Sequence, residues 1–348
     1  MKQVLVLLLY LILTSQTFLP LNSPLLLYPQ QRPVSRDNGK VDFFGMGFYN
    51  GSVKKSCQGG EMKTKEFIIG NLILGAATDI GPRILKLTVR ERPDANLFGA
   101  VDLSIDTPDG LWRIYGGHRL WTSPEANPRS YSMDDRPVRI EEKGGVVRIY
   151  GNPETQNNVQ KEIEIRPAGK DAVEVAHRIR NTGRWTIRLA CWALSVMKAG
   201  GFAVVPVKAG GEGLLPDRRL SLWPYTDLSD KRLVMEKDFI FLKQDVKSRD
   251  PIKIGAMAYP AWTAYWVDGL LFAKQFVQEK GDYPDFGCNV EVYTNSAMLE
   301  LETVGPLKNL EPGCVAEHIE TWTVKEIPSL SPSQKDVEEK ILKKGLPG

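Results

Sequence analysis

The sequence has little net charge, few cysteines and few histidines. Its 348 residues carry a formal net charge of only +3, so composition gives no case for nucleic-acid binding and we expect no nucleic-acid partner. The four cysteines include no Cys-x-x-Cys pair, which argues against a zinc knuckle or a thioredoxin-like site. If the chain is exported, Cys288 and Cys314 could form a disulfide, since their segments could be adjacent strands. The alternative is that Cys57, Cys191, Cys288 and Cys314 are reduced and mostly buried.

Amphipathic helical patterns are nearly absent between residues 41 and 325. Runs of strand-forming residues take their place, as in residues 84–89 and 172–179, and Gly, Pro, Asn and Asp separate them. Many short strands of this kind predict an all-β fold, a large antiparallel β-sandwich over residues 41–328. Residues 329–348 are expected to form a short helical tail, with Ser331 as its N-cap and Pro332 at its first position.

The apolar run near the N-terminus, residues 4–14, is short. A helix needs about 20 apolar residues to span a bilayer, so this run fits the core of a signal peptide better. We therefore expect residues 1–20 to be a signal peptide or an N-terminal anchor and residues 21–40 to be a linker. The protein is then expected to be exported, as a periplasmic, extracellular or membrane-anchored protein.

A carboxylate lies in the middle of a strand-like run near the C-terminus. Side chains alternate across a strand, so Asn289, Glu291 and Tyr293 are expected on one face, with Cys288 and the neighbouring valines on the other. An amide, a carboxylate and a phenol together would suit the hydroxyls of a sugar. The alternative is an ordinary solvent-facing strand surface.

A second segment, residues 116–125, starts with two glycines and brings His118, Arg119, Trp121 and Glu125 close together in sequence. Histidine suits proton transfer near neutral pH, and arginine supplies fixed donors for hydroxyl or carboxylate oxygens. The alternative is a structural, salt-bridged loop.

Three further polar patterns lie within strand-like runs. Lys274 is flanked by apolar residues and, if it points inward, needs a carboxylate such as Glu291 or Asp285; alternatively, its ammonium group reaches the surface. Glu300 and Glu302 share one strand face, where they could do acid–base work or simply be solvated. His318, Glu320 and Trp322 also share a face, but their spacing is not distinctive for a metal, and we predict no metal and no cofactor.

Residues 65–325 resemble the galactose mutarotase-like superfamily, which includes the aldose 1-epimerases. The resemblance rests on residues 80–87, 116–125, 181–201 and, above all, 287–313. In aldose epimerases a strand carries the catalytic base, a glutamate, and a Leu-x-Pro-Gly turn follows it. Glu291 matches that glutamate, and Leu310-Glu311-Pro312-Gly313 matches the turn. The resemblance implies the supersandwich fold, with a sugar-binding cleft across one sheet.

The sequence departs from the mutarotase pattern at one important position. Mutarotases use a histidine to protonate the ring oxygen, and the matching residues 189–197 contain none. His118 is the hypothesised replacement, lying across the cleft from Glu291. We therefore predict a carbohydrate-binding protein whose partner is a sugar or oligosaccharide and which could act on the anomeric centre. The expected catalytic residues are Glu291 and His118, and the expected binding residues are Arg119, Trp121, Glu125, Trp262, Lys274, Asp285, Asn289 and Tyr293.

Two other classes of function stay open at this point. A polysaccharide lyase or hydrolase would need a second acid–base group near Glu291, for which Lys274, Tyr293 and Glu125 are candidates. A noncatalytic envelope protein would use the sandwich only as a scaffold. The fold cannot decide among these, because function belongs to the site.

Overall fold

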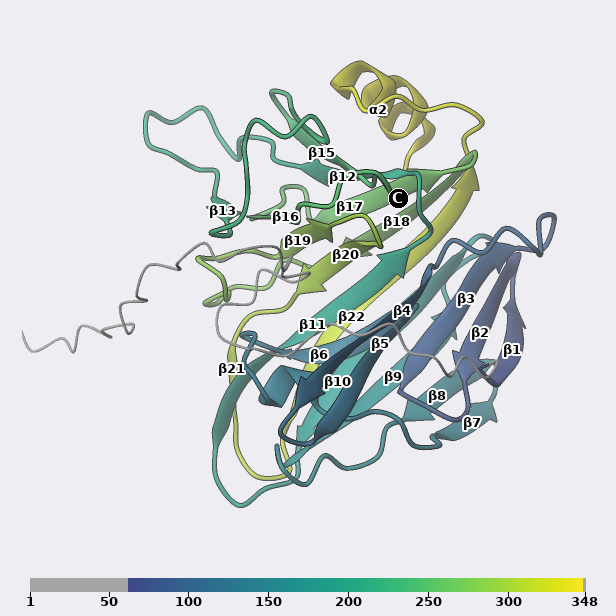
Figure 1. Cartoon of the computed structure of the whole chain (residues 1–348). Coiled ribbons are helices and arrows are strands. Elements are labelled where there is room, and N and C mark those ends of the chain that lie inside the picture. Colours follow the sequence, from purple (N-terminus) through teal and green to yellow (C-terminus); the bar gives the residue numbers. More distant parts are fainter. Residues whose placement is uncertain (1–61, 347–348) are drawn as a thin grey trace, which may run out of the picture. The chain divides into compact units, whose positions relative to one another are not determined.

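Two large antiparallel sheets pack face to face in the computed structural model, which describes residues 62–346 (Figure 1). All of these residues belong to one compact unit, Asp42–Gly348. The predicted signal or anchor and the predicted linker, residues 1–20 and 21–40, lie outside the described residues. The prediction of an all-β antiparallel sandwich is confirmed.

The first sheet contains the strand that carries Glu291. Its order is β1 (Thr64–Ile69), β2 (Leu72–Ala77), β3 (Arg83–Val89), β6 (His118–Ser123), β11 (Ile187–Met197), β20 (Leu299–Val304), β19 (Val290–Thr294), β16 (Ile252–Ala256) and β13 (Leu220–Leu222), with β21 (Lys308–Leu310) beside β11.

The second sheet covers the inner face of the first. Its order is β14 (Leu233–Met235), β15 (Phe239–Lys243), β12 (Phe202–Pro206), β17 (Trp262–Val267), β18 (Leu270–Phe276), β22 (Val315–Glu326), β10 (Ala172–Asn181), β9 (Val159–Pro167), β8 (Val146–Tyr150) and β7 (Arg139–Lys143). The strand predicted over residues 172–179 is therefore present as β10.

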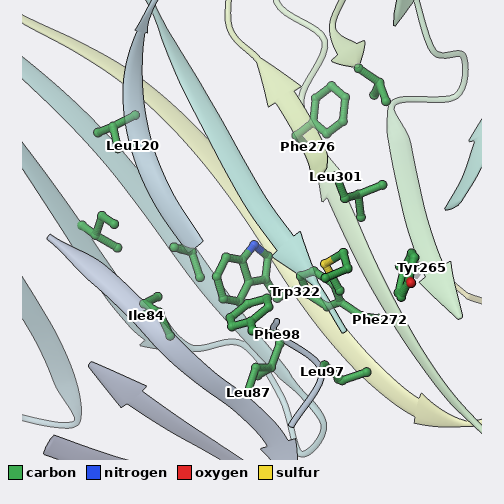
Figure 2. Packing of buried hydrophobic residues seen from close by; sticks show 14 of the residues in the cluster. Ile84, Leu87, Leu97, Phe98, Leu120, Tyr265, Phe272, Phe276, Leu301 and Trp322 are labelled. Carbon is green, nitrogen blue, oxygen red and sulfur yellow. The ribbon is translucent and has the colours of Figure 1, made fainter. Parts of the chain in front are cut away.

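The main core lies between the two sheets, because alternate residues of each strand point inward. Leu120 and Leu301 come from the first sheet, and Phe272 and Trp322 come from the second (Figure 2). Phe98 packs edge-on against both Phe272 and Trp322, with ring centroids 5.8 Å apart in each case. Because these side chains face the core, the residues that alternate with them along each strand face the outside of the sandwich.

A hairpin covers part of the outer face of the first sheet. Its strands are β4 (Ala100–Thr107) and β5 (Gly110–Gly116), which pair only with each other. Val101, Ile105, Trp112 and Ile114 of the hairpin form a second apolar cluster with side chains of β6, β11 and β19. A short 3-10 helix, η1 (Arg129–Tyr131), contributes Tyr131 to the same cluster. The outer face is therefore walled on one side by aromatic residues.

The C-terminal tail forms the expected short helix, α2 (Gln334–Lys340), followed by the 3-10 turn η2 (Leu342–Lys344). Its N-cap is Ser333, which accepts a hydrogen bond from the Asp336 backbone N–H, so the helix begins two residues later than predicted. Val337 and Ile341 pack with Trp262 and other residues of the second sheet. Among residues 62–346, no helix is long and apolar enough to cross a membrane.

Of the two alternatives for Cys288 and Cys314, a disulfide or reduced thiols, the structure has the reduced thiols. Cys288 directly precedes β19 in the first sheet, whereas Cys314 directly precedes β22 in the second, so the two segments are not adjacent strands. Cys191 is also a free thiol, and Cys57 lies outside the described residues.

Candidate functional site

Five neighbouring strands, β6, β11, β20, β19 and β16, place polar and aromatic side chains on the outer face of the first sheet. Their inward-facing neighbours belong to the main core, so strand alternation fixes these side chains on the other side. Cross-strand pairing sets Trp121 beside Trp192 and Glu291 beside Glu302. We call the following residues the outer-face cluster: Arg119, Trp121, Trp192, Lys253, Glu291, Tyr293, Glu300 and Glu302.

The ammonium group of Lys253 lies between two carboxylates. Its Nζ atom is 2.7 Å from Glu291 Oε2 and 3.1 Å from Glu302 Oε2. The indole Nε1 of Trp192 donates to the same Glu302 oxygen over 2.8 Å. Lys253 Nζ also lies 4.7 Å from the ring centroids of Trp192 and Trp223. The lysine is thus surrounded by two negative charges and two aromatic faces, an arrangement that favours its charged form.

Burial dominates the electrostatics of these carboxylates. Glu291 is fully buried, which raises its pKa well above the usual range; Lys253 opposes this shift, while Asp285 and Glu302 add to it. Burial likewise raises the pKa of Glu302 against the opposing effect of Lys253. Burial alone would lower the pKa of Lys253, but the two carboxylates outweigh it and raise that pKa. The lysine therefore keeps its proton, while burial disfavours the charged forms of the two glutamates.

A second ion pair lies beside the first. Arg119 Nη2 is 2.8 Å from Glu300 Oε1, and both side chains are buried. The guanidinium carbon of Arg119 lies 4.3 Å from the ring centroid of Trp121 and 5.9 Å from that of Trp112 in the hairpin. Arg119 is therefore held between a carboxylate and aromatic rings, with its remaining N–H groups available.

Several buried polar atoms of this face have no hydrogen-bond partner among the described residues. They include Oε1 of Glu291, Oε1 of Glu302, Nε and Nη1 of Arg119, and Nε1 of Trp112. In native proteins more than about 90% of buried polar groups are hydrogen-bonded to protein or ordered water. Donors and acceptors that are left over at one place, between aromatic rings, are suited to a ligand that carries several hydroxyl groups.

A groove of about 150 Å³ lies next to the outer-face cluster. Its lining residues are Ser221, Leu222, Trp223, Pro224, Asp285 and Phe286. Trp223 belongs both to this lining and to the contacts of Lys253, so its ring lies between the groove and the buried ion pair. Phe286 is 92% exposed and has a positive φ of 60°, which costs a bulky side chain conformational energy. Such strain at an exposed aromatic residue is typical of functional surfaces.

Four predicted site residues come together on the outer face, namely Glu291, Arg119, Trp121 and Tyr293. Asp285 lines the adjacent groove. Glu125 follows β6 and accepts a hydrogen bond from the hydroxyl of Tyr131, which packs against Trp121. The structure thus gathers six of the ten predicted residues at or beside one place.

Two predicted residues have structural contacts instead. Asn289 precedes β19, and its side chain forms two hydrogen bonds with the backbone of Ala258. Its Oδ1 accepts from the Ala258 N–H over 2.6 Å, and its Nδ2 donates to the Ala258 carbonyl over 3.2 Å. Trp262 lies in the second sheet, 3% exposed, in the cluster covered by α2. Trp262, one of the expected binding residues, is therefore not part of the outer face.

His118 and Lys274 point into the interior between the two sheets. His118 Nδ1 lies 2.8 Å from Ser195 Oγ, and Lys274 Nζ lies 3.2 Å from Glu320 Oε1. The expected position of His118 across from Glu291 is not found, because Arg119 faces outward and its neighbour on the strand must face inward. Lys274 does point inward and has a carboxylate partner, but that partner is Glu320, not Glu291 or Asp285.

Sequence reasoning did not single out Lys253 or Trp223. Lys253 stands between Ile252 and Ile254 in a short apolar strand, the same signal that drew attention to Lys274. Trp223 follows a strand of only three residues, and nothing local indicates that its ring reaches Lys253. Both contacts depend on long-range strand pairing.

Comparisons with known proteins give no sequence match: no family model and no curated protein matches the chain. Solved structures do match. A protein from Synechocystis sp. PCC 6803 is 11% identical, with 77% of this chain and 97% of that chain covered and a TM-score of 0.50. A TPR-domain containing protein from Parabacteroides distasonis is 11% identical, with 78% of this chain covered and a TM-score of 0.53. The chain spans about half the length of that protein, 49%.

A galactose mutarotase-like protein from Lactobacillus casei also matches, at 9% identity and a TM-score of 0.45, with 76% of this chain and all of that chain covered. At such identities the comparisons concern the fold alone.

Proposed function

We propose that this protein binds a carbohydrate at the outer-face cluster. The observation that carries the proposal is the group of buried, unpartnered polar atoms on Glu291, Glu302, Arg119 and Trp112, set among tryptophan rings. A sugar ring offers hydroxyl groups at its edge and apolar C–H groups on its faces. It would satisfy these donors and acceptors while packing against indole rings.

The groove beside the cluster gives the sugar its place of approach. Its volume, about 150 Å³, is below the roughly 300–1,000 Å³ of sites that enclose a drug-sized ligand, so it fits one sugar ring better than a longer chain. Trp223 and Phe286 supply aromatic surface, and Asp285 supplies a carboxylate. The half-buried Trp223 ring covers Lys253, and its displacement would let a hydroxyl group reach Glu291.

A catalytic role for Glu291 is a second candidate, favoured by its position directly opposite a second buried carboxyl group, Glu302, on the neighbouring strand. In this role Glu291 takes the proton of the anomeric hydroxyl while the bond between the anomeric carbon and the ring oxygen breaks. The ring oxygen receives a proton from Glu302, whose pKa burial also raises. Closure on the other face of the carbonyl returns both protons and gives the other anomer. His118 has no part in this scheme, because it faces the interior.

Binding is tested with a panel of monosaccharides and glycans by calorimetry, comparing the wild type with Glu291→Gln. We expect the substitution to weaken binding about 10- to 100-fold, the cost of losing a hydrogen bond to a charged group. Glu164→Gln is the matched control: Glu164 is also buried and ion-paired, but it lies on β9 in the second sheet. Equal binding by the wild type and Glu291→Gln would place the site elsewhere.

The same panel separates the other classes of function. Faster anomerisation that is lost in Glu291→Gln supports the epimerase-like role, and release of products from oligosaccharides indicates a lyase or hydrolase. A stable protein partner without any glycan binding would indicate a scaffold. We also propose that the chain is exported, as residues 1–20 predict; finding the full-length protein in the cytosolic fraction would contradict this.

A further inference from the structure

All three histidines of the chain meet in the interior between the two sheets. His177 of β10 and His318 of β22 are direct cross-strand partners, and His118 of β6 reaches them from the opposite sheet. The ring centroids of His118 and His177 are 4.9 Å apart, and those of His177 and His318 are 6.1 Å apart. Three histidines from three strands of two sheets thus form one buried group.

The Nε2 atoms of two of these histidines lie close to each other and near the carboxylate of Glu320. His118 Nε2 and His177 Nε2 are 2.7 Å apart, and His177 Nε2 is 3.8 Å from Glu320 Oε2. One ligand atom from each of the three residues lies within 4.8 Å of the other two. Two imidazoles and one carboxylate are a donor set that divalent transition metals bind.

The other nitrogen of each imidazole is held by a second residue. His177 Nδ1 lies 3.0 Å from the carbonyl oxygen of His318. A carbonyl can only accept, so Nδ1 carries the proton and Nε2 keeps its lone pair. His118 Nδ1 lies 2.8 Å from Ser195 Oγ. Histidine ligands of metals generally donate their other ring N–H to a carboxylate, a backbone carbonyl or water, and the Ser195 hydroxyl would take that place behind His118.

The carboxylate of Glu320 is oriented as well. The indole Nε1 of Trp322 donates to Oε2 over 2.6 Å, and the hydroxyl of Thr303 donates to Oε1. Glu320, His118 and His177 are at most 1% exposed. We propose that His118, His177 and Glu320 bind one divalent transition metal ion of the zinc class between the two sheets.

The geometry requires shifts of up to about 1.5 Å, the largest between His118 and Glu320, whose ligand atoms lie within 4.8 Å of each other. Bonds of 2.0–2.1 Å in tetrahedral coordination separate two ligand atoms by about 3.3 Å. The two Nε2 atoms would therefore move apart by about 0.6 Å, and His177 and Glu320 would approach by about 0.5 Å. The 2.7 Å contact in this structure is the hydrogen bond that the ion replaces. The His118 proton then resides on Nδ1 and is donated to Ser195 Oγ.

Lys274 competes with such an ion for Glu320. Its ammonium group lies 3.2 Å from Glu320 Oε1 and also donates to the carbonyl groups of Ala193 and Leu301. A second cation beside the carboxylate would repel the metal ion. Replacing Lys274 with Met, which is apolar and of similar length, should therefore strengthen metal binding. A purely structural network predicts only a loss of stability for the same change.

The test is refolding of the full chain with and without Zn²⁺, because the cluster is closed to solvent once the sheets have packed. After removal of loose ions by gel filtration, bound zinc is measured by mass spectrometry. We expect about one zinc per chain in the wild type, tighter binding in Lys274→Met, and loss of bound zinc in His177→Gln and Glu320→Gln. Ser195→Ala, which removes the group behind His118, should weaken binding about 10- to 100-fold.

His318→Gln is the matched control, since it changes a buried histidine of the same group but keeps the carbonyl that His177 contacts. It should retain zinc. Circular dichroism shows whether each variant has folded, and only folded variants are compared. If neither the wild type nor Lys274→Met retains zinc, the proposal is wrong. It is equally wrong if all folded variants retain the same amount, since the zinc is then bound elsewhere. Neither outcome bears on sugar binding at the outer face.

Discussion

Replacing Lys253 with Met removes the positive charge between Glu291 and Glu302 while keeping most of the side-chain volume. Removing one partner of a buried ion pair typically costs about 3–5 kcal/mol, because the other charge stays buried without compensation. Here two carboxylates are left, 2.7 and 3.1 Å from the lost ammonium group. We expect a loss of this size in the free energy of unfolding at pH 8.

The loss in the free energy of unfolding should depend on pH, and the structure determines whether stability falls or rises with pH. Burial already raises the pKa of Glu291, and without Lys253 that pKa rises further. The native state then holds a proton that the unfolded chain releases above about pH 5, so stability falls as pH rises toward the folded pKa. One such proton changes the stability by about 1.4 kcal/mol per pH unit. The stability of Lys253→Met itself should therefore fall by up to about 2.7 kcal/mol between pH 6 and pH 8.

Denaturant unfolding followed by tryptophan fluorescence at pH 6 and pH 8 measures both effects. Lys308→Met is the control: Lys308 pairs with Glu279 over 2.6 Å, but both side chains are more than one third exposed, so its loss should cost about 0–1 kcal/mol. The double variant Lys253→Met/Glu291→Gln should recover part of the stability at pH 8. A pH-independent loss, or one as small as that of the control, would refute the buried arrangement of charges.

Three further changes test other parts of the fold. Asn289→Ala should cost about 1–3 kcal/mol, since it leaves the buried backbone of Ala258 without two hydrogen bonds, and thermal unfolding measures this. Gly255→Ala should destabilise the chain and alter sugar binding, because a Cβ atom there would lie 2.6 Å from Cys288 Sγ; unchanged melting and binding would contradict that contact. Phe286→Gly should raise stability by about 1 kcal/mol by relieving its positive φ, and it should weaken sugar binding if the groove is used.

Local sequence patterns were enough to predict the fold class. Alternation of apolar and polar residues identified strands such as β10 and β19, and the Ser, Pro and Gln signals identified the short terminal helix. The same alternation correctly placed Glu291 and Tyr293 on one face. These features depend only on neighbours in sequence, because strand geometry itself has a period of two.

The wrong predictions concern side-chain orientations and partners that depend on contacts between residues far apart in the sequence. His118 and Arg119 were both expected to face the site, as residues of a loop can, but β6 is a strand and sends them to opposite sides. For an inward-pointing Lys274 the sequence suggested Glu291 or Asp285 as partner, but strand pairing places β18 next to β22, where Glu320 is its partner. Asn289 lies just outside the regular strand, so the alternation does not apply to it.

Strand β20 gives the two buried clusters a common wall. Glu302 faces outward to Lys253, and the next residue, Thr303, faces inward to Glu320. Burial lowers the pKa of Lys274, and the charges of Glu320 and, through the sheet, of Glu302 oppose that effect. A single strand therefore does not screen the charges of one cluster from those of the other. Free-energy linkage is reciprocal, so a change of charge on either side must alter the affinity for protons and ions on the other.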